Sequence, residues 1–406
     1  MATIIIHRSG ILALGVAMAL ATPSLCAAAE KSFEIYGFIM ADYIQDFDGR
    51  LSPDWDDAFR PSKIGIDGQY GGDGQASISV KQSRIGVQGS MPTDQSANPI
   101  NFKFEIDMFG TGADAGQTTL RLRHAYGEWG SILAGQTHSL FMDIDVFPNT
   151  IDYWGPPGMV FYRNVQLRWT PYRTSNSHFA VAIERPGNDI DSGNLRLVDG
   201  FQDLDVQNDE ELPDFTAQYR YGGGWGHVQV GGILRKVGYE LRADPSDSWT
   251  DGSETGWGVN LGSNIMVGAK DKILLQVVYG EGIASYMNDG GMDLAPALEY
   301  TGGSATGLEA EAVELLGVLA YYDHYWSDRW SSSIGYSFTK VDNTDFQDPG
   351  AFEKGSYASA NLLYYPTANL MMGGELMWGE RENNDGASDD AYRFQFSVKY
   401  NFGIKL

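Results

Sequence analysis

The chain has 406 residues and a formal net charge of −25, with 53 Asp and Glu against 28 Lys and Arg. A chain this acidic is a poor partner for nucleic acid, and we expect no such partner. Beyond the N-terminus, no stretch offers the roughly 18 uninterrupted apolar residues that a transmembrane helix needs.

The N-terminus has the features of a secretory signal peptide. Arg8 supplies the positive charge, residues 11–21 form a short apolar segment, and three alanines at 27–29 satisfy the small-residue rule for cleavage. We therefore expect a signal peptide over residues 1–29 and one mature domain over residues 30–406.

Cys26 is the single cysteine of the chain. If it leaves with the signal peptide, the mature protein has neither a disulfide framework nor a thiol-ligated metal. A lipoprotein signal centred on Cys26 is disfavoured, because Leu25 stands where a small residue is expected.

Apolar and polar residues alternate in several segments of the mature chain. In residues 100–108, Ile100, Phe102 and Phe104 alternate with Lys103 and Glu105. Successive strand side chains point to opposite faces, so the pattern predicts a strand with one apolar and one polar face. Similar alternation occurs over residues 165–169, 215–221, 334–338 and 392–406. The last of these is long for a globular strand of about 5–6 residues, but it suits a tilted strand that crosses a bilayer.

The connections between these segments distinguish a membrane barrel from a soluble sandwich. Short connections are predicted near residues 129–131, 172–177, 221–226, 268–272, 326–330 and 366–369. Long connections are predicted near residues 46–63, 139–163, 187–214, 237–255, 282–308, 341–354 and 380–390. Tight turns at one end and long loops at the other are typical of outer-membrane barrels. We therefore predict an all-β transmembrane antiparallel barrel of about 16 strands.

Several segments resemble a known family, the DcaP-like outer-membrane porins. The resemblance lies in residues 121–130 (RLRHAYGEWG), 133–137 (LAGQT), 141–145 (FMDID) and 155–161 (GPPGMVF), with Gln166, Arg168 and Trp169, and in residues 35–42 and 83–89. It implies a homotrimer of barrels in the bacterial outer membrane, in contact with lipid and lipopolysaccharide. It also implies passage of small anionic solutes, dicarboxylates among them. Some members carry an N-terminal coiled-coil extension, which we do not expect here because strand-like sequence begins at Ile35.

Basic residues recur on the polar faces of the predicted strands. As candidates for a substrate pathway we take Arg84, Lys103, Arg121, Arg123, Arg168, Arg220, Arg393 and Lys399. Guanidinium groups suit carboxylates because they donate two parallel hydrogen bonds. We expect a dicarboxylate site near Arg121, Arg123 and Arg168, with carboxylates on a facing wall. The alternative is that several of these cations simply pair with carboxylates such as Glu105 and Asp107.

The connection over residues 139–163 is the best candidate for a constriction. It carries Asp143, Asp145, Asp152, Tyr153, Trp154 and Arg163, together with Pro156 and Pro157. A long loop in a compact fold is usually functional or disordered, and this one is too aromatic for disorder. We expect it to fold inward and narrow the pore; the alternative is an outward loop packed against a neighbouring subunit.

Metal and enzyme chemistry find little support in the sequence. The acidic stretches at residues 54–57 and 189–214 lack a calcium-loop signature, and solvated external charge bridged to lipopolysaccharide is the simpler interpretation. The histidines His124, His138, His178, His227 and His324 have no metal-ligand spacing, and there is no nucleophile elbow or phosphate loop. We predict a passive porin that is not an enzyme and has no cofactor. The alternatives are a barrel enzyme of the outer membrane and a structural adhesin that uses the acidic loops.

Overall fold

The computed structural model describes residues 31–48, 50–53, 57–94, 96–110, 119–198, 201–301 and 304–406. The expected signal peptide lies outside these described residues, as do Asp54, Asp56 and Asp199 of the acidic stretches.

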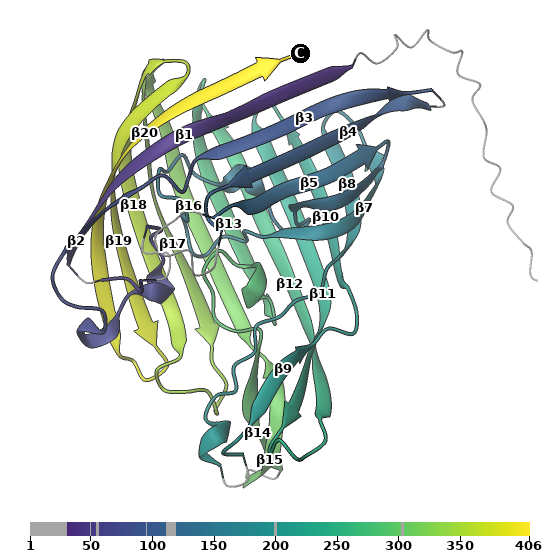
Figure 1. Cartoon of the computed structure of the whole chain (residues 1–406), viewed down its shortest axis with the longest axis vertical. Coiled ribbons are helices and arrows are strands. Elements are labelled where there is room, and N and C mark those ends of the chain that lie inside the picture. Colours follow the sequence, from purple (N-terminus) through teal and green to yellow (C-terminus); the bar gives the residue numbers. More distant parts are fainter. Residues whose placement is uncertain are drawn as a thin grey trace, which may run out of the picture.

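Sixteen antiparallel strands form a closed barrel, as predicted (Figure 1). Each strand pairs with the next one around the barrel, and β20 pairs with β1 to close it. The strands are β1 (Ser32–Asp48), β3 (Arg84–Thr93), β4 (Ser96–Asp107), β5 (Arg121–Trp129), β6 (Ile132–His138), β7 (Arg163–Arg173), β8 (Ser177–Glu184), β10 (Asp214–Gly223), β11 (Gly226–Arg242), β12 (Thr250–Val267), β13 (Asp271–Glu281), β16 (Glu314–Ser327), β17 (Trp330–Asp342), β18 (Phe352–Thr367), β19 (Leu370–Asn383) and β20 (Ser388–Lys405). Closure leaves the barrel without a free edge.

The remaining elements lie in the connections. The short strands are β2 (Gln75–Ser79), which pairs with β1, β9 (Asp205–Asp209), which pairs with β11, and the separate hairpin of β14 (Leu294–Thr301) and β15 (Ser304–Ala312). Five 3₁₀ helices are described: η1 (Pro61–Lys63), η2 (Ile66–Gly68), η3 (Ile144–Val146), η4 (Leu195–Leu197) and η5 (Ala284–Tyr286). Across the described residues, no helix is long and apolar enough to cross a membrane.

The strand faces follow the alternation seen in the sequence. On β4, Ile100 and Phe104 are 45% and 46% exposed, whereas Glu105 and Asp107 are buried inside the barrel. On β20, Tyr400 is exposed and Gln395 is fully buried. The apolar rows therefore face outward, where lipid surrounds an outer-membrane barrel, and the polar rows face the lumen.

The two ends of the barrel differ in their connections. At one end, here called the turn end, β1 begins, β20 ends and the hairpins are joined by tight turns such as 130–131 and 328–329. The other end, here called the loop end, carries the long connections 49–83, 108–120, 139–162, 185–213 and 282–313.

Two of the predicted long connections are much shorter than expected. The predicted loop 237–255 shrinks to 243–249, because β11 and β12 stay paired as far as Leu241 and Thr250. The predicted loop 380–390 shrinks to 384–387, because β19 and β20 pair up to Glu382 and Ser388. The strand ends 250–255, 380–383 and 388–390 lack an apolar row, so their sequence is typical of loops although the backbone ladder continues.

The barrel wall is low on one side. The strands β5, β6, β7 and β8 have 9, 7, 11 and 8 residues, whereas β18 and β20 have 16 and 18. The connection 139–162 leaves β6 and re-enters β7 on this low side (Figure 1).

The hydrophobic core lies within the lumen. Connections of the loop end supply Phe59 from 49–83, Phe141 and Met159 from 139–162, and Tyr286 from 282–313. These side chains pack on inward-facing residues of the tall wall such as Leu319. Because these connections fill part of the barrel, the open lumen is confined to a narrower path.

Candidate functional site: a basic constriction inside the barrel

The connection 139–162, here called the inward loop, crosses the lumen against the tall wall. Asn260 Nδ2 donates to the Phe141 carbonyl at 2.8 Å, and Gln276 Nε2 donates to the Gly158 carbonyl at 3.1 Å. A Cβ on Gly158 would lie 2.1 Å from the carbonyl oxygen of Phe338. Only glycine permits this approach, so the loop is pressed directly onto the wall.

The far part of the inward loop is tied to β19, β20 and the segment before β3. The backbone N–H of Ile151 donates to Glu375 Oε2 at 2.8 Å. Its carbonyl accepts from Gln82 Nε2 at 2.8 Å and from Gln395 Nε2 at 3.1 Å. Side chains of the wall thus satisfy loop backbone groups that would otherwise be buried without partners.

The acidic residues expected in the constriction fasten the loop through hydrogen bonds and ion pairs. Asp152 accepts hydrogen bonds from the backbone N–H groups of Phe59, Trp154 and Gly155 at 3.0, 2.9 and 2.8 Å. Burial nevertheless raises the pKa of the Asp152 carboxyl.

At the other end of the loop, two aspartates anchor it to the wall. Asp143 Oδ2 lies 2.6 Å from His227 Nε2, and Asp145 Oδ2 accepts from Arg220 at 2.5 Å. Arg220 also lies 3.5 Å from Asp143.

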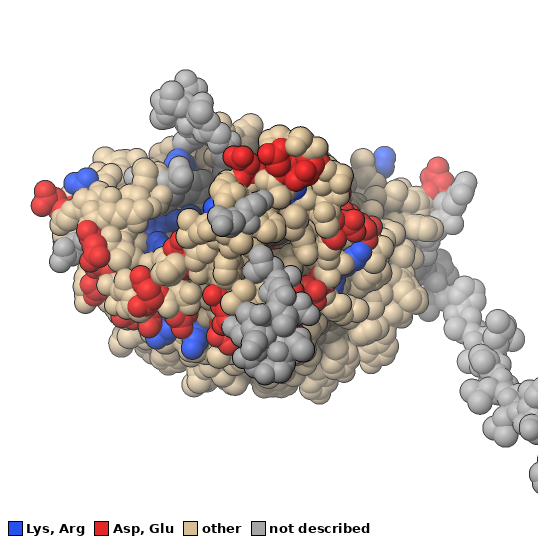
Figure 2. All heavy atoms as spheres, turned by 90° about the horizontal axis from the view of Figure 1, so that it is seen from below, with Lys and Arg blue, Asp and Glu red and all other residues tan. Residues whose placement is uncertain are grey.

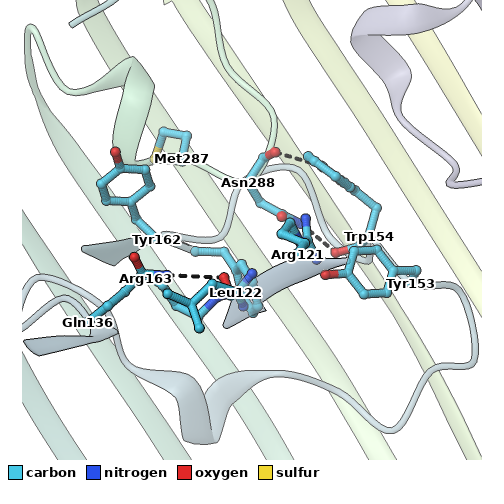
Figure 3. Close-up of a pocket in the computed structure, with 10 residues that line it drawn as sticks. Arg121, Leu122, Gln136, Tyr153, Trp154, Tyr162, Arg163, Met287 and Asn288 are labelled. Atoms are coloured by element: carbon cyan, nitrogen blue, oxygen red, sulfur yellow. Dashed lines mark hydrogen bonds between the residues drawn. The ribbon is translucent and has the colours of Figure 1, made fainter. Parts of the chain in front are cut away.

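A second connection, residues 282–313, folds inward beside the first, although no sequence pattern indicates it. Trp154 Nε1 donates to the Asn288 carbonyl at 2.6 Å, and Asn288 Nδ2 donates back to the Trp154 carbonyl at 2.6 Å (Figure 3). The Arg60 guanidinium lies 4.3 Å from the Trp154 ring centroid and 3.0 Å from Asp289. Three connections of the loop end are therefore locked together above the lumen.

Two cavities lie on either side of the inward loop. The loop-side cavity, of about 310 Å³, is lined by Arg121, Leu122, Gln136, Tyr153, Trp154, Phe161, Tyr162, Arg163, Met287 and Asn288 (Figure 3). The turn-side cavity, of about 380 Å³, has among its lining residues Phe38, Arg84, Arg123, Asp152, Lys399 and Asn401. Tyr153 and Phe161 line both cavities, so these two rings mark the narrow place between them.

Four of the predicted pathway cations gather around two carboxylates of β4, and we call this group the basic cluster. Its members are Arg84, Lys103, Arg121 and Arg123, with Glu105 and Asp107. Arg121 donates twice to Asp107, at 3.1 and 2.7 Å. Arg123 donates to Glu105 at 2.7 Å, to Asp107 at 3.0 Å and to the Tyr153 hydroxyl at 3.1 Å.

The remaining two cations complete the cluster more loosely. Arg84 and Lys103 lie 3.5 and 3.6 Å from Glu105. The pairing that the sequence left open as an alternative therefore occurs, but four cations against two carboxylates leave a net charge of +2. Acids and bases interleave on one wall, because β4 lies between β3 and β5 and no facing acidic wall is needed to pair them.

Each cavity also holds a cation outside the basic cluster. Arg163 lines the loop-side cavity, with its guanidinium 5.2 Å from the Phe161 ring centroid. Lys399 lines the turn-side cavity, with its ammonium 4.1 Å from the Phe38 ring centroid. In the described part of the chain, neither has a carboxylate within 4.0 Å, whereas every arginine and lysine of the basic cluster does.

The other predicted pathway cations lie elsewhere, and none of them is among the residues that line the two cavities. Arg168 donates to Gln166 and to the His138 carbonyl. Arg393 is fully buried against Asp46, with contacts of 2.6 and 2.9 Å. Among the described residues, no group of three His, Cys, Asp or Glu side chains is placed to hold a metal ion.

A closed barrel of sixteen strands, apolar outside and polar within, and narrowed by inward connections, defines an outer-membrane porin. The chain belongs to the DcaP outer membrane protein family, whose family model matches residues 12–402. The family expected from the sequence and the outer-membrane location are thereby confirmed.

Solved structures show the same fold. The outer membrane channel DcaP of Acinetobacter baumannii is 24% identical, with a TM-score of 0.74 over 92% of this chain and 97% of that one. The anion-selective porin from Comamonas acidovorans is 10% identical, with a TM-score of 0.54 over 92% and 100%. The trimer form of OmpT from Vibrio cholerae is 12% identical, with the same TM-score and coverage. No curated protein matches the chain.

Proposed function

We propose that this porin gives passive passage to small hydrophilic solutes and favours organic anions, dicarboxylates among them. The observation that carries the proposal is the charge at the constriction. Five cations line the two cavities, against one lining carboxylate, Asp152. The cations are Arg84, Arg121, Arg123, Arg163 and Lys399. Guanidinium groups bind carboxylates through paired N–H donors, so an anion in transit finds donors on both sides of the narrow place.

The strong negative charge of the whole chain does not oppose this proposal. Acidic side chains are spread over the rim of the loop end, while basic ones are visible within the hollow (Figure 2). Charges in solvent are screened over about 8–10 Å at physiological salt, so the rim acts weakly on an ion at the constriction. The fixed charges of the wall lie close to the ion and act strongly on it.

A solute would pass the constriction in two steps. From the loop end, a carboxylate enters the loop-side cavity beside Arg121 and Arg163. It then passes the rings of Tyr153 and Phe161 to reach the turn-side cavity, where Arg123 is among the lining residues. Aromatic walls with separate cations permit release at each step, because no single site binds the solute too tightly.

The test is single-channel recording in a planar bilayer. Under a potassium chloride gradient, the reversal potential should indicate anion preference, and succinate should block the current. Replacing Arg121 and Arg123 together with Ala removes two cations of the basic cluster and should weaken the block markedly. Replacing Asp209 and Glu210 of the loop end with Asn and Gln should barely change it.

The outcomes separate this proposal from its rivals. An effect of the loop acids without an effect of the arginine pair would make the acidic rim the selectivity element. A barrel without conductance would favour a structural adhesin. Hydrolysis of a membrane lipid by the purified protein would favour a barrel enzyme.

We also propose that the protein is a homotrimer in the outer membrane, surrounded by lipid and lipopolysaccharide. The low wall supports contact between copies. β6 has 7 residues, which when tilted span roughly 18 Å at about 3.3 Å per residue, less than the roughly 25 Å apolar band of such barrels. A protein neighbour would cover this sector without thinning the bilayer. Native mass spectrometry in mild detergent should give a trimer, and a monomer would contradict the proposal.

A further inference from the structure

His138 and Arg163 face each other across neighbouring strands at the root of the inward loop. They are direct register partners on β6 and β7, the last residue of one strand and the first of the other. The loop closes immediately beyond them, where the Ser139 N–H donates to the Tyr162 carbonyl at 3.0 Å. We call His138 and Arg163 the root pair.

Both side chains of the root pair hold a buried nitrogen without a hydrogen-bond partner. These atoms are His138 Nε2 and Arg163 Nη1, judged against the described part of the chain. Most buried polar atoms in proteins have a partner, so two orphans on directly opposed residues call for an explanation. Arginine has five N–H donors and no acceptor, and His138 is a second donor in the tautomer with hydrogen on Nε2. The group missing from Arg163 is therefore a hydrogen-bond acceptor, and the same acceptor would satisfy His138 in that tautomer.

The charges around Arg163 make that acceptor an anion. Arg121, Arg123 and Arg84 are among the charged groups that act on Arg163, against Asp107. Asp107 is already engaged by Arg121 and Arg123 at 2.7 and 3.0 Å. Arg163 therefore carries a positive charge that the described part of the chain leaves without a close carboxylate.

The position allows access from the lumen. Arg163 lines the loop-side cavity together with Tyr162 and Gln136 (Figure 3). Its Nη1 is shut off from solvent as it stands, but rotation about the last bonds of a long arginine side chain would turn this nitrogen toward the cavity. The His138 ring lies 4.8 Å from the His124 ring, centroid to centroid, and packs beside Phe161 at 6.3 Å. One face of the site is thus aromatic and the other is cationic.

We infer that the root pair forms a binding subsite for a single anionic group, either the carboxylate of a passing solute or a monovalent inorganic anion. The inference deepens the proposed anion pathway and rests on it. It also moves the principal anion contact from Arg121 and Arg123, which are paired with Asp107, to Arg163. A bound anion would lie against the two residues from which the inward loop leaves and to which it returns.

The first experiment locates the anion. Crystals of the porin grown in sodium bromide should show an anomalous peak within hydrogen-bond distance of Arg163, absent in the Arg163→Gln variant. Adding succinate should abolish the peak if solute carboxylates share the subsite, and should leave it if the subsite takes inorganic anions alone. Only water at this position, in bromide and in succinate, would overturn the inference.

The second experiment measures function in the bilayer. Arg163→Gln should lower the ratio of anion to cation permeability about tenfold, because one charge about 6 Å from the ion path in water acts equally and oppositely on an anion and a cation. Arg163→Lys, which keeps the charge, should recover much of the ratio and serves as the second variant if Arg163→Gln does not fold. Lys270→Gln is the matched control, because Lys270 lies in a turn of the turn end and pairs with Asp328.

The failures are distinguishable. If the wild-type protein prefers anions and Arg163→Gln keeps the wild-type ratio, the subsite is refuted while the proposed function stands. If the wild-type protein prefers cations, the proposed function itself fails, whatever the bromide map contains.

Discussion

Neutralising Asp107 should make the pore more selective for anions. Asp107 has no exposed surface and accepts from Arg121 at 3.1 and 2.7 Å, from Arg123 at 3.0 Å and from the Tyr153 hydroxyl at 3.1 Å. Asp107→Asn keeps the shape and an acceptor oxygen but removes the charge. The net charge of the basic cluster then rises from +2 to +3, with two arginines partly released toward the lumen.

The size of the effect follows from Coulomb's law. One unit charge about 6 Å from an ion changes its energy by about 0.7 kcal/mol at the dielectric constant of water, and by more where the wall lowers the local dielectric constant. The anion and the cation are affected by equal amounts of opposite sign, so their energies move apart by about 1.4 kcal/mol, and the anion-to-cation permeability ratio should rise about tenfold. Loss of a charged partner from a buried pair also destabilises a protein by about 3–5 kcal/mol. Folding of the variant therefore has to be verified first, by the heat-dependent shift of the barrel on electrophoresis.

The assay is the reversal potential of the channel under a potassium chloride gradient. Asp107→Asn should move it toward the chloride equilibrium potential. The control is Asp328→Asn, which also removes a paired carboxylate, but one whose side chain is 91% exposed at the turn end, far from the cavities. An unchanged or reduced anion preference in a folded Asp107→Asn porin would refute the view that wall charge at the constriction sets selectivity.

Three further perturbations probe the loop and the orientation of the barrel. Gly158→Ala should displace the inward loop from the wall, because the added carbon overpacks the contact at a cost of about 1–3 kcal/mol. The current noise of the open channel should therefore rise. Unchanged noise would show that the loop tolerates the added carbon. Cysteine placed at Asp199 should react with an impermeant reagent on intact cells and cysteine at Lys270 should not, because the loop end should face outward. The reverse labelling would show that the barrel has the opposite orientation in the membrane. Burial raises the pKa of Asp152 above its unfolded value, so the stability it contributes is present at acid pH and lost as pH rises through the folded pKa. Asp152→Asn should therefore flatten the decline of the melting temperature above about pH 4, and an identical pH profile would show that Asp152 does not titrate with folding.

The barrel could be predicted from sequence because its determinants are local. Alternation of apolar and polar residues, such as Phe104 and Glu105 on β4, indicates which side chains of a strand face lipid and which face the lumen. Each strand also pairs with the barrel strand that precedes or follows it in the chain. The same logic located the inward loop, whose aromatic and proline content sets it apart from the other connections. Where the apolar row ends, as in residues 380–383 and 388–390, the pattern no longer indicates a strand, and the ladder that β19 and β20 form there was not predicted for that reason.

The constriction depends on contacts between distant parts of the chain, which no local pattern records. Arg60 and Asp289 are 229 positions apart, and Trp154 and Asn288 are 134 apart. The alternation pattern places the eight candidate cations on the polar faces of the strands. It does not indicate which of them forms an ion pair with a carboxylate. Arg393 is buried by Asp46 from the other end of the chain, whereas Lys399 on the same strand lines a cavity.

The charge of the chain and the charge at its constriction have opposite signs because different requirements act on each surface. Acids at the loop end stay solvated, so they cost little and keep the exposed connections soluble. Acids inside the barrel are desolvated and have to be satisfied individually, as Asp152 is by backbone N–H groups and Asp107 by arginines. A lumen carboxylate bound in this way already has hydrogen-bond partners. A cation in excess of such pairs, like Arg163 or Lys399, is therefore the group that can bind an ion in transit. Selectivity in such a pore follows from the count of unmatched charges at the narrow place, to which the composition of the whole chain is no guide.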